Sequence, residues 1–239
     1  IYNDSGTSFT DTNLTSGTTY YYKFYAENYS YYSAGDTLSS GTAAPTPTIS
    51  ASGSLAALTT TYGTNSSTTS FTASGSDLQG DITLTPPAGF EVSTSSTTGF
   101  ASSLTLTRAS NAVASTTIYV RLAAIASAGS KSGNIALTST NATTVNVATV
   151  ASTVNTKALT ITGMTAQNKT FDNTTTATLT GTPSYSGLVN GETFSVTGTA
   201  SATFADANVG TGKTVTVSGY TAPSANYTVT QPSLSANIT

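Results

Sequence analysis

The ten Asp and Glu residues are the side chains best equipped for chemistry in this 239-residue sequence. Two carboxylates held about 5–9.5 Å apart can hydrolyse a glycosidic bond, one as the acid and the other as nucleophile or base. Glu91, however, alternates with apolar neighbours and is predicted to lie on the solvent face of a strand. The other candidates lie in turns rich in Gly and Asn, where an Asx side chain caps its own backbone: Asp77, Asp81, Asp172 and Asp206. No catalytic pair and no cofactor are predicted, and a structural Ca²⁺ in one of these turns is the alternative.

The residue types used for nucleophilic, metal and phosphate chemistry are missing or misplaced. Cys and His are both absent, which removes thiolate and imidazole ligands and the usual activated Ser or Cys nucleophile. Gly212, Lys213 and Thr214 match a loose phosphate-binding loop, but an alternating strand pattern follows where that loop needs a helix. The sequence therefore predicts no enzyme activity and no catalytic, cofactor-binding or metal-binding residue.

The low charge of the chain bears on its partners. Charged residues make up only 7% of the sequence, against about a quarter in ordinary soluble domains, and the formal net charge is −3. No basic run is present to bind nucleic acid. The longest mainly apolar stretch, residues 120–128, is shorter than a membrane helix and is interrupted by Arg121. We expect neither a nucleic-acid partner nor a membrane span in this segment.

Apolar residues alternate with Thr or Ser in segment after segment, as in residues 82–85, 104–107, 118–122 and 215–217. A period of two is typical of half-buried strands, with hydroxyls on the solvent face and Ile, Val, Leu or aromatic side chains toward a core. Short strands separated by turn residues are typical of antiparallel sandwiches. The predicted fold is all-β, with almost no helix.

Two boundaries divide the chain. Pro45 and Pro47 cannot donate to a strand ladder and separate a Tyr-rich segment from a Thr-rich one. Near residue 156 one alternating strand ends and another begins. The predicted domains are residues 1–44, 48–155 and 156–239, of which the first is too short for a complete sandwich. Short links between domains predict a stiff, elongated row, about 80–100 Å long if each module spans about 30 Å.

The first segment resembles the last strands of a fibronectin type III domain. Leu14, Gly17 and Tyr20 match the tyrosine corner of that family, in which a Tyr hydroxyl bonds to the backbone upstream. Tyr20, Tyr22 and Phe24 then follow at alternate positions and are expected to line an apolar face. Because the first strands of such a domain are missing here, either the sequence is truncated or another chain supplies strands by β-augmentation.

The second segment, residues 48–155, is similar to the immunoglobulin-like repeats of large secreted or surface proteins of Bacteroidota. The resemblance rests on the order of elements in residues 71–93, 104–107, 118–122 and 132–135. It implies an immunoglobulin-like β-sandwich.

The third segment, residues 156–239, resembles a YDG-type repeat, a β-sandwich module that occurs in tandem on bacterial surface proteins. The Tyr-Asp-Gly of that family stands here as Phe171, Asp172 and Asn173. The resemblance implies that Phe171 is a core aromatic, and Asn173 tolerates the positive φ that the turn needs. The three resemblances together imply tandem antiparallel immunoglobulin-like β-sandwich modules in an elongated row.

Tyrosines crowd the first segment and are its candidate contact residues. If Tyr20 and Tyr22 point inward, strand alternation places Tyr21 and Tyr25 outside. Exposed Tyr stacks on sugar rings or anchors a protein partner, so a contact surface is predicted at Tyr21, Tyr25, Tyr29 and Tyr31. The alternative is that these side chains fill strand edges and module interfaces. Asp36, Thr37 and Leu38 resemble the O-glycan acceptor of Bacteroidota, which makes Thr37 a candidate O-glycosylation site.

These observations favour a non-catalytic structural or adhesive segment of a large secreted cell-surface protein, acting as a stiff spacer or fibre. Strand edges normally carry charges that block edge-to-edge pairing, and these strands lack them. The expected partners are neighbouring repeats, other copies of the chain, or cell-surface glycans or proteins, and the expected location is extracellular. The alternatives are an accessory carbohydrate-binding region of a secreted enzyme and a polymer subunit completed by a neighbour's strand.

Overall fold

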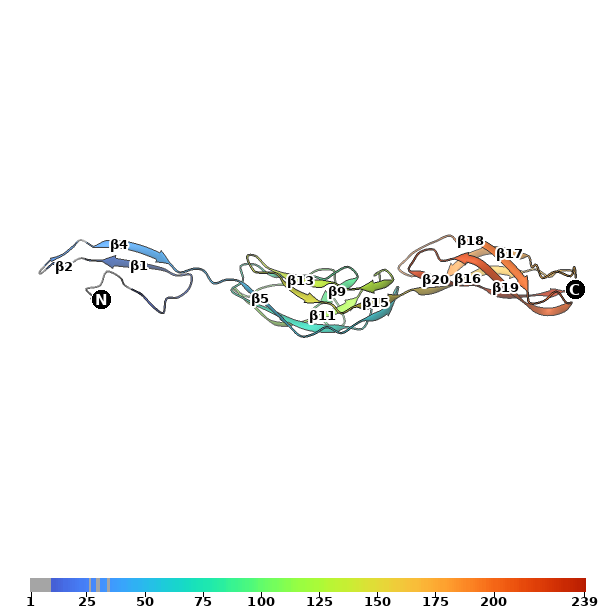
Figure 1. Cartoon of the computed structure of the whole chain (residues 1–239), viewed down its shortest axis with the longest axis horizontal. Coiled ribbons are helices and arrows are strands. Elements are labelled where there is room, and N and C mark those ends of the chain that lie inside the picture. Colours follow the sequence, from blue (N-terminus) through green and yellow to red (C-terminus); the bar gives the residue numbers. More distant parts are fainter. Residues whose placement is uncertain (1–9, 26, 29–30, 34) are drawn as a thin grey trace.

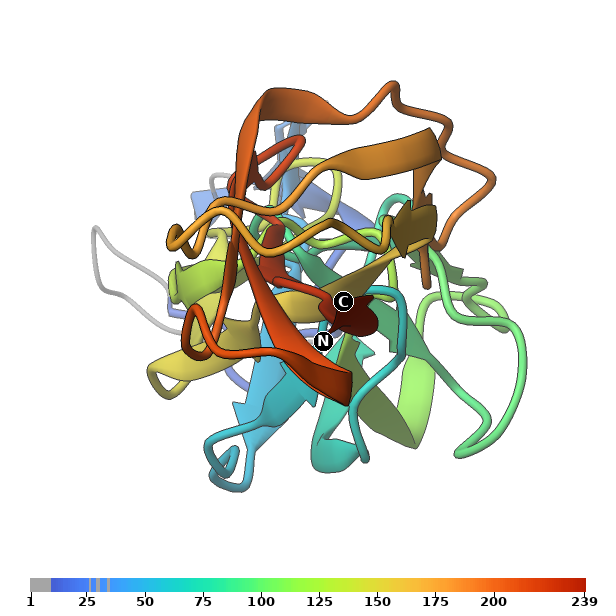
Figure 2. The ribbon, with the colours of Figure 1, turned by 90° about the vertical axis from the view of Figure 1, so that its right-hand side faces the viewer.

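The fold is known from a computed structural model, which describes residues 10–25, 27–28, 31–33 and 35–239. These residues contain strands, turns and loops but no helix, and so no helix that would reach across a membrane. The predicted all-β class is confirmed. Figure 1 shows three units that follow one another along the long axis, coloured blue, green to yellow, and orange to red. Seen along that axis in Figure 2, the third unit lies in front of the other two.

The first unit is a narrow ribbon. Strand β1 (Thr19–Phe24) pairs antiparallel with β4 (Asp36–Gly41), and this register places Tyr22 opposite Leu38. Two short strands, β2 (Glu27–Asn28) and β3 (Tyr31–Tyr32), pair between them.

The second unit is a sandwich of two four-stranded sheets, in the orders β10-β8-β13-β14 and β5-β7-β11-β9, with a small sheet β12-β15-β6 at one end. Its strands are β5 (Thr48–Ser52), β6 (Thr59–Thr61), β7 (Thr69–Ser76), β8 (Ile82–Thr85), β9 (Phe90–Ser93), β10 (Leu104–Leu106), β11 (Val113–Leu122), β12 (Gly129–Lys131), β13 (Asn134–Thr138), β14 (Val145–Ala148) and β15 (Ser152–Asn155).

The third unit packs two three-stranded sheets, in the orders β17-β16-β20 and β18-β19-β21. Its strands are β16 (Lys157–Ala166), β17 (Leu179–Ser186), β18 (Thr197–Phe204), β19 (Gly210–Thr221), β20 (Tyr227–Thr230) and β21 (Ser233–Ile238).

The cores follow the predicted alternation. Ile82 and Leu84 of β8 face Ile118 and Val120 of β11 across the second unit, and none of these side chains has exposed surface. The residues between them carry hydroxyls toward solvent. Burial of each such aliphatic side chain stabilises the unit by about 1.5–3 kcal/mol, so the interior of each sandwich holds its two sheets together.

Two parallel strand pairs depart from the antiparallel prediction. Strand β15 pairs parallel with β6, and β16 pairs parallel with β20. Hydrophobic alternation tells which face of a strand is buried but carries no information on strand direction, so the sequence pattern could not reveal these pairs.

The links between units are short. Only Thr156 separates β15 from β16, and residues 42–47, which include Pro45 and Pro47, separate β4 from β5. With one linking residue, the second and third units can move independently only if their facing surfaces slide past each other.

Close backbone approach at a bulge makes Gly219 irreplaceable in the third unit. Its φ is +98°, and a Cβ there would lie 2.0 Å from the carbonyl oxygen of Thr199 on the paired strand. We predict that Gly219→Ala destabilises the chain by about 2–4 kcal/mol, because the backbone itself must shift. Gly212→Ala is the matched control, since φ is +59° there and nothing lies within 4 Å. Urea unfolding should show a cost of only about 1 kcal/mol for the control, and equal costs for the two variants would contradict the clash.

Candidate functional site

Among the described residues, the acidic side chains do not converge on one site. The described residues contain no group of three or more His, Cys, Asp or Glu side chains that could hold a metal ion. Glu91 forms an ion pair with Arg121 at 2.9 Å, and the Arg121 guanidinium lies 4.1 Å from the Phe100 ring centroid. Glu91 was predicted to face solvent, but this packing covers most of its side chain because Arg121 reaches over it from the adjacent strand.

Asp172 and Asp206 have the predicted turn role, and each also binds a lysine. Asp172 Oδ1 accepts the Thr174 N–H at 2.9 Å, and Asp206 Oδ1 accepts the Asn208 N–H at 2.8 Å. Lys169 lies 2.6 Å from Asp172, and Lys213 hydrogen-bonds Asp206. Lys213 sits inside strand β19 rather than in a phosphate-binding loop before a helix.

These contacts give the third unit a predictable acid response. Hydrogen bonds from Lys169 and from Thr174 lower the pKa of Asp172 to about 2 from its ordinary 3.8. A lowered pKa in the folded state means that the carboxylate adds stability above pH of about 4, and that this stability is lost as pH falls through about 2. We predict that Asp172→Asn lowers the melting temperature at pH 7 and reduces the loss of stability between pH 4 and 2. Thermal unfolding of both proteins across that range measures this, and parallel pH curves would contradict it.

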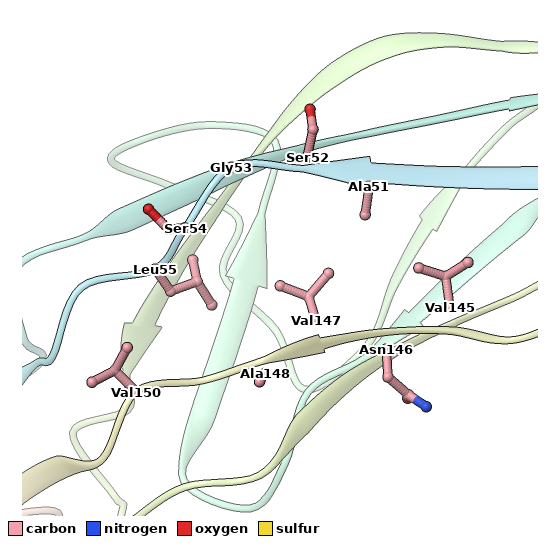
Figure 3. Close-up of a pocket in the computed structure, with 10 residues that line it drawn as sticks. All are labelled: Ala51, Ser52, Gly53, Ser54, Leu55, Val145, Asn146, Val147, Ala148 and Val150. Atoms are coloured by element: carbon pink, nitrogen blue, oxygen red, sulfur yellow. The ribbon is translucent and has the colours of Figure 1, made fainter.

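A groove of the second unit lies at a seam of the sandwich, between the edge strands β5 and β14 (Figure 3). Its volume is about 370 Å³, and its lining includes Leu55, Val147, Val150 and the Asn146 side chain. The lining carries no charged side chain; its polar groups are those of Ser52, Ser54 and Asn146.

Tyr21 and Tyr25, two of the four predicted contact tyrosines, lie on the outer face of the first unit. Tyr21 is 81% exposed, and Tyr25 is also exposed, with the Lys23 ammonium 5.2 Å from its ring centroid. Thr37 is exposed and pairs with Lys23, so the structure brings Tyr21, Tyr25 and the candidate glycosylation site to one face. Tyr29 lies outside the described residues. Tyr31 belongs to β3, and its side chain is outside the description.

The inner face of the same ribbon is an open apolar groove. Leu14, Tyr22, Phe24 and Leu38 line a hollow of about 330 Å³, in which Phe24 remains 48% exposed and Leu38 59% exposed. The Tyr22 hydroxyl donates to Asp11 Oδ2 at 2.9 Å, and burial together with that carboxylate raises the Tyr22 pKa.

The hydrogen bond predicted for the tyrosine corner is present in the first unit. The Thr15 N–H donates to the Tyr20 hydroxyl at 2.7 Å. Hydrogen bonding from the Thr15 side chain, and then from its backbone, lowers the pKa of Tyr20.

The most elaborate polar arrangement lies where the second unit meets the third. Tyr62 and Gly63 follow β6 of the second unit, Val189 and Glu192 lie in the turn after β17 of the third, and Tyr227 begins β20. We call these five residues the joint.

A single carboxylate connects the two units at the joint. The Tyr62 hydroxyl donates to Glu192 Oε1 at 2.8 Å, and the Tyr227 hydroxyl donates to Glu192 Oε2. The two phenol rings meet edge to face, with centroids 5.4 Å apart and an interplanar angle of 89°. Tyr62 is only 5% exposed, so its ring is buried in the contact between units. Hydrogen bonds to a charged acceptor contribute about 1.5–3 kcal/mol each, more than neutral ones.

Two further contacts restrict sliding at the joint. The Ala128 N–H of the second unit donates to Asn226 Oδ1 of the third at 2.9 Å. Gly63, at φ +90°, lies against Val189 so closely that a Cβ would be 2.5 Å from Val189 Cγ2. The glycine therefore meets two demands at once, a left-handed backbone and space for the neighbouring side chain.

The environment keeps Tyr227 protonated. Burial and the hydrogen bond to Glu192 raise the Tyr227 pKa to about 12 from its ordinary 10.0. A raised tyrosine pKa in the folded state adds stability that is complete below pH of about 10 and is lost as pH rises through about 12. At neutral pH the phenol is a donor, as the joint requires.

No sequence pattern singled out Glu192, because an acidic residue in a polar turn has no neighbours that distinguish it from other acidic residues in turns. Phe171 was predicted to be a core aromatic, but it is 50% exposed at the end of the third unit.

The joint generates a prediction about Glu192→Ala. This change removes the acceptor for two largely buried hydroxyls and should cost about 1–3 kcal/mol for each hydroxyl left unpaired. It should also broaden the distance distribution between spin labels placed in the second and third units, measured by double electron–electron resonance. Glu91→Ala is the matched control, because it removes a paired carboxylate inside the second unit. A distribution as narrow in Glu192→Ala as in the Glu91→Ala control would contradict the role given to Glu192.

Comparison with known proteins identifies one segment of the chain. Residues 155–234 match the family model of the YDG domain. No curated protein matches the sequence. Among solved structures, the crystal structure of the I9–I11 tandem from titin is similar with 13% sequence identity and a TM-score of 0.25. The similarity covers 80% of this chain and 66% of the titin chain.

Proposed function

We propose that this chain is a non-catalytic structural segment of a large secreted cell-surface protein, in which β-units joined end to end act as a stiff spacer. The observation that carries the proposal is the joint, where a carboxylate of one unit binds a tyrosine of each and the link has one residue. Such a contact fixes the orientation of one unit relative to the other, which domains joined by a flexible linker would not need. The YDG domain at residues 155–234 supports a repeat architecture.

The surface also suits an extracellular row of repeats. The strands expose hydroxyls, and 7% charged residues leave few charges to guard their edges. Neighbouring repeats, other copies of the chain or glycans on sites such as Thr37 are the partners that would cover such edges.

Two alternatives have observations of their own. The open groove lined by Phe24 and Leu38 favours a subunit that a neighbour completes by donating a strand. The exposed rings of Tyr21 and Tyr25 favour a carbohydrate-binding surface attached to a secreted enzyme.

Small-angle X-ray scattering at increasing concentration tests the proposal. We predict an elongated particle with a maximum dimension of about 80–100 Å that does not change with concentration. A much shorter dimension, or the broad profile of a flexible chain, would contradict the spacer.

The same samples separate the alternatives. Growth of the particle with concentration that Leu38→Asp abolishes would favour strand donation. Glycan-array binding that Tyr21→Ala or Tyr25→Ala removes would favour carbohydrate recognition.

A further inference from the structure

Phe171 occupies in the third unit the place that Tyr62 occupies in the second. Tyr62 follows strand β6, which runs parallel to β15, the last strand of its unit. Phe171 follows Lys169, which bridges in parallel to Ile238, at the end of the last strand β21. The Tyr62 N–H donates to the Asn155 carbonyl at 2.9 Å, and the Phe171 N–H donates to the Thr239 carbonyl at 2.8 Å.

The backbone reaches a positive φ after each aromatic ring, one position later in the third unit than in the second. Gly63 has φ +90° directly after Tyr62, and Asn173 has φ 63° two residues after Phe171. The backbone hydrogen bonds place both residues beside the C-terminal end of the last strand of their unit. For Phe171 this is the far end of the third unit, where Figure 1 marks the C-terminus.

The two rings differ in what covers them. Tyr62 is 5% exposed, and its ring lies against Tyr227 of the following unit. Phe171 is 50% exposed. Residues of the following unit cover Tyr62, so a unit placed in the same way against Phe171 would cover its ring.

We propose that the face around Phe171 is a docking surface for a further unit of the same kind as residues 157–239. It would repeat the joint at the end of the row, and this rests on the proposed function as a spacer of stacked units. The occupant is recognised by its chemistry: an apolar side chain in the place of Val189 and an aromatic ring in the place of Tyr227. Phe171 has no hydroxyl, so this second joint is held by ring and apolar contacts, while the counterpart of Glu192 binds only its own unit's tyrosine.

The absence of Trp from the sequence allows a direct test. The chain is extended after Thr239 by a second copy of residues 156–239, and Phe171→Trp, made in the original copy alone, supplies the only indole. We expect acrylamide to quench this introduced indole several-fold less in the extended chain than in the 239-residue chain. The extended chain with Val189→Asp in the added copy alone is the control, and it should restore quenching because it puts a charge into the apolar contact.

Equal quenching of the Phe171→Trp variant in its two chain lengths, with the added copy folded, would overturn the proposal. Tyr62→Trp in the 239-residue chain separates this failure from that of the spacer. If the indole is protected in the Tyr62→Trp variant but not in the Phe171→Trp variant, only the second docking surface fails. If the indole of the Tyr62→Trp variant is quenched freely, the existing joint and the spacer fail with it. Should Phe171→Trp not fold, nuclear magnetic resonance shifts of the native Phe171 ring give the same comparison, with shifts unchanged by the extension counting against docking.

Discussion

The structure depends on the sharing of one carboxylate between two tyrosines. The second and third units each have their own core, and nothing in those cores fixes how one unit stands relative to the other. Glu192 does so, because its two oxygens accept from Tyr62 on one side and Tyr227 on the other. Partly burying the Glu192 carboxylate costs free energy unless its oxygens are hydrogen-bonded. Only 7% of the residues are charged, and this one lies where two units meet.

The joint and the cores solve different problems with different residues. Alternating Ile, Val and Leu side chains hold sheets together without regard to exact direction, since apolar contact is non-directional. Hydrogen bonds and edge-to-face rings have preferred geometry and so select one orientation. The one-residue link keeps the two faces together, and the close contact of Gly63 with Val189 excludes larger side chains. A stiff row follows from directional contacts placed at short links.

Much of the fold could be predicted from the sequence, while the joint could not. Period-two alternation identified strands such as β8 and β11, and the spacing of Tyr20 after Gly17 anticipated the bond from Thr15. Alternation is a local signal, however, and says nothing of strand direction or of contacts between residues as distant as Tyr62 and Glu192. Phe171 was mispredicted for the same reason. The sequence pattern of an aromatic residue after a strand predicts a core position and cannot tell whether its own unit covers the ring.

With the joint formed, the second and third units are expected to tumble as one body. Residual dipolar couplings from backbone amides of the full chain test it most directly, because each unit reports its own alignment tensor. The account predicts that both units share one tensor, equal in size and orientation. Tensors that differ in magnitude between the two units would mean that they reorient independently, and would contradict it.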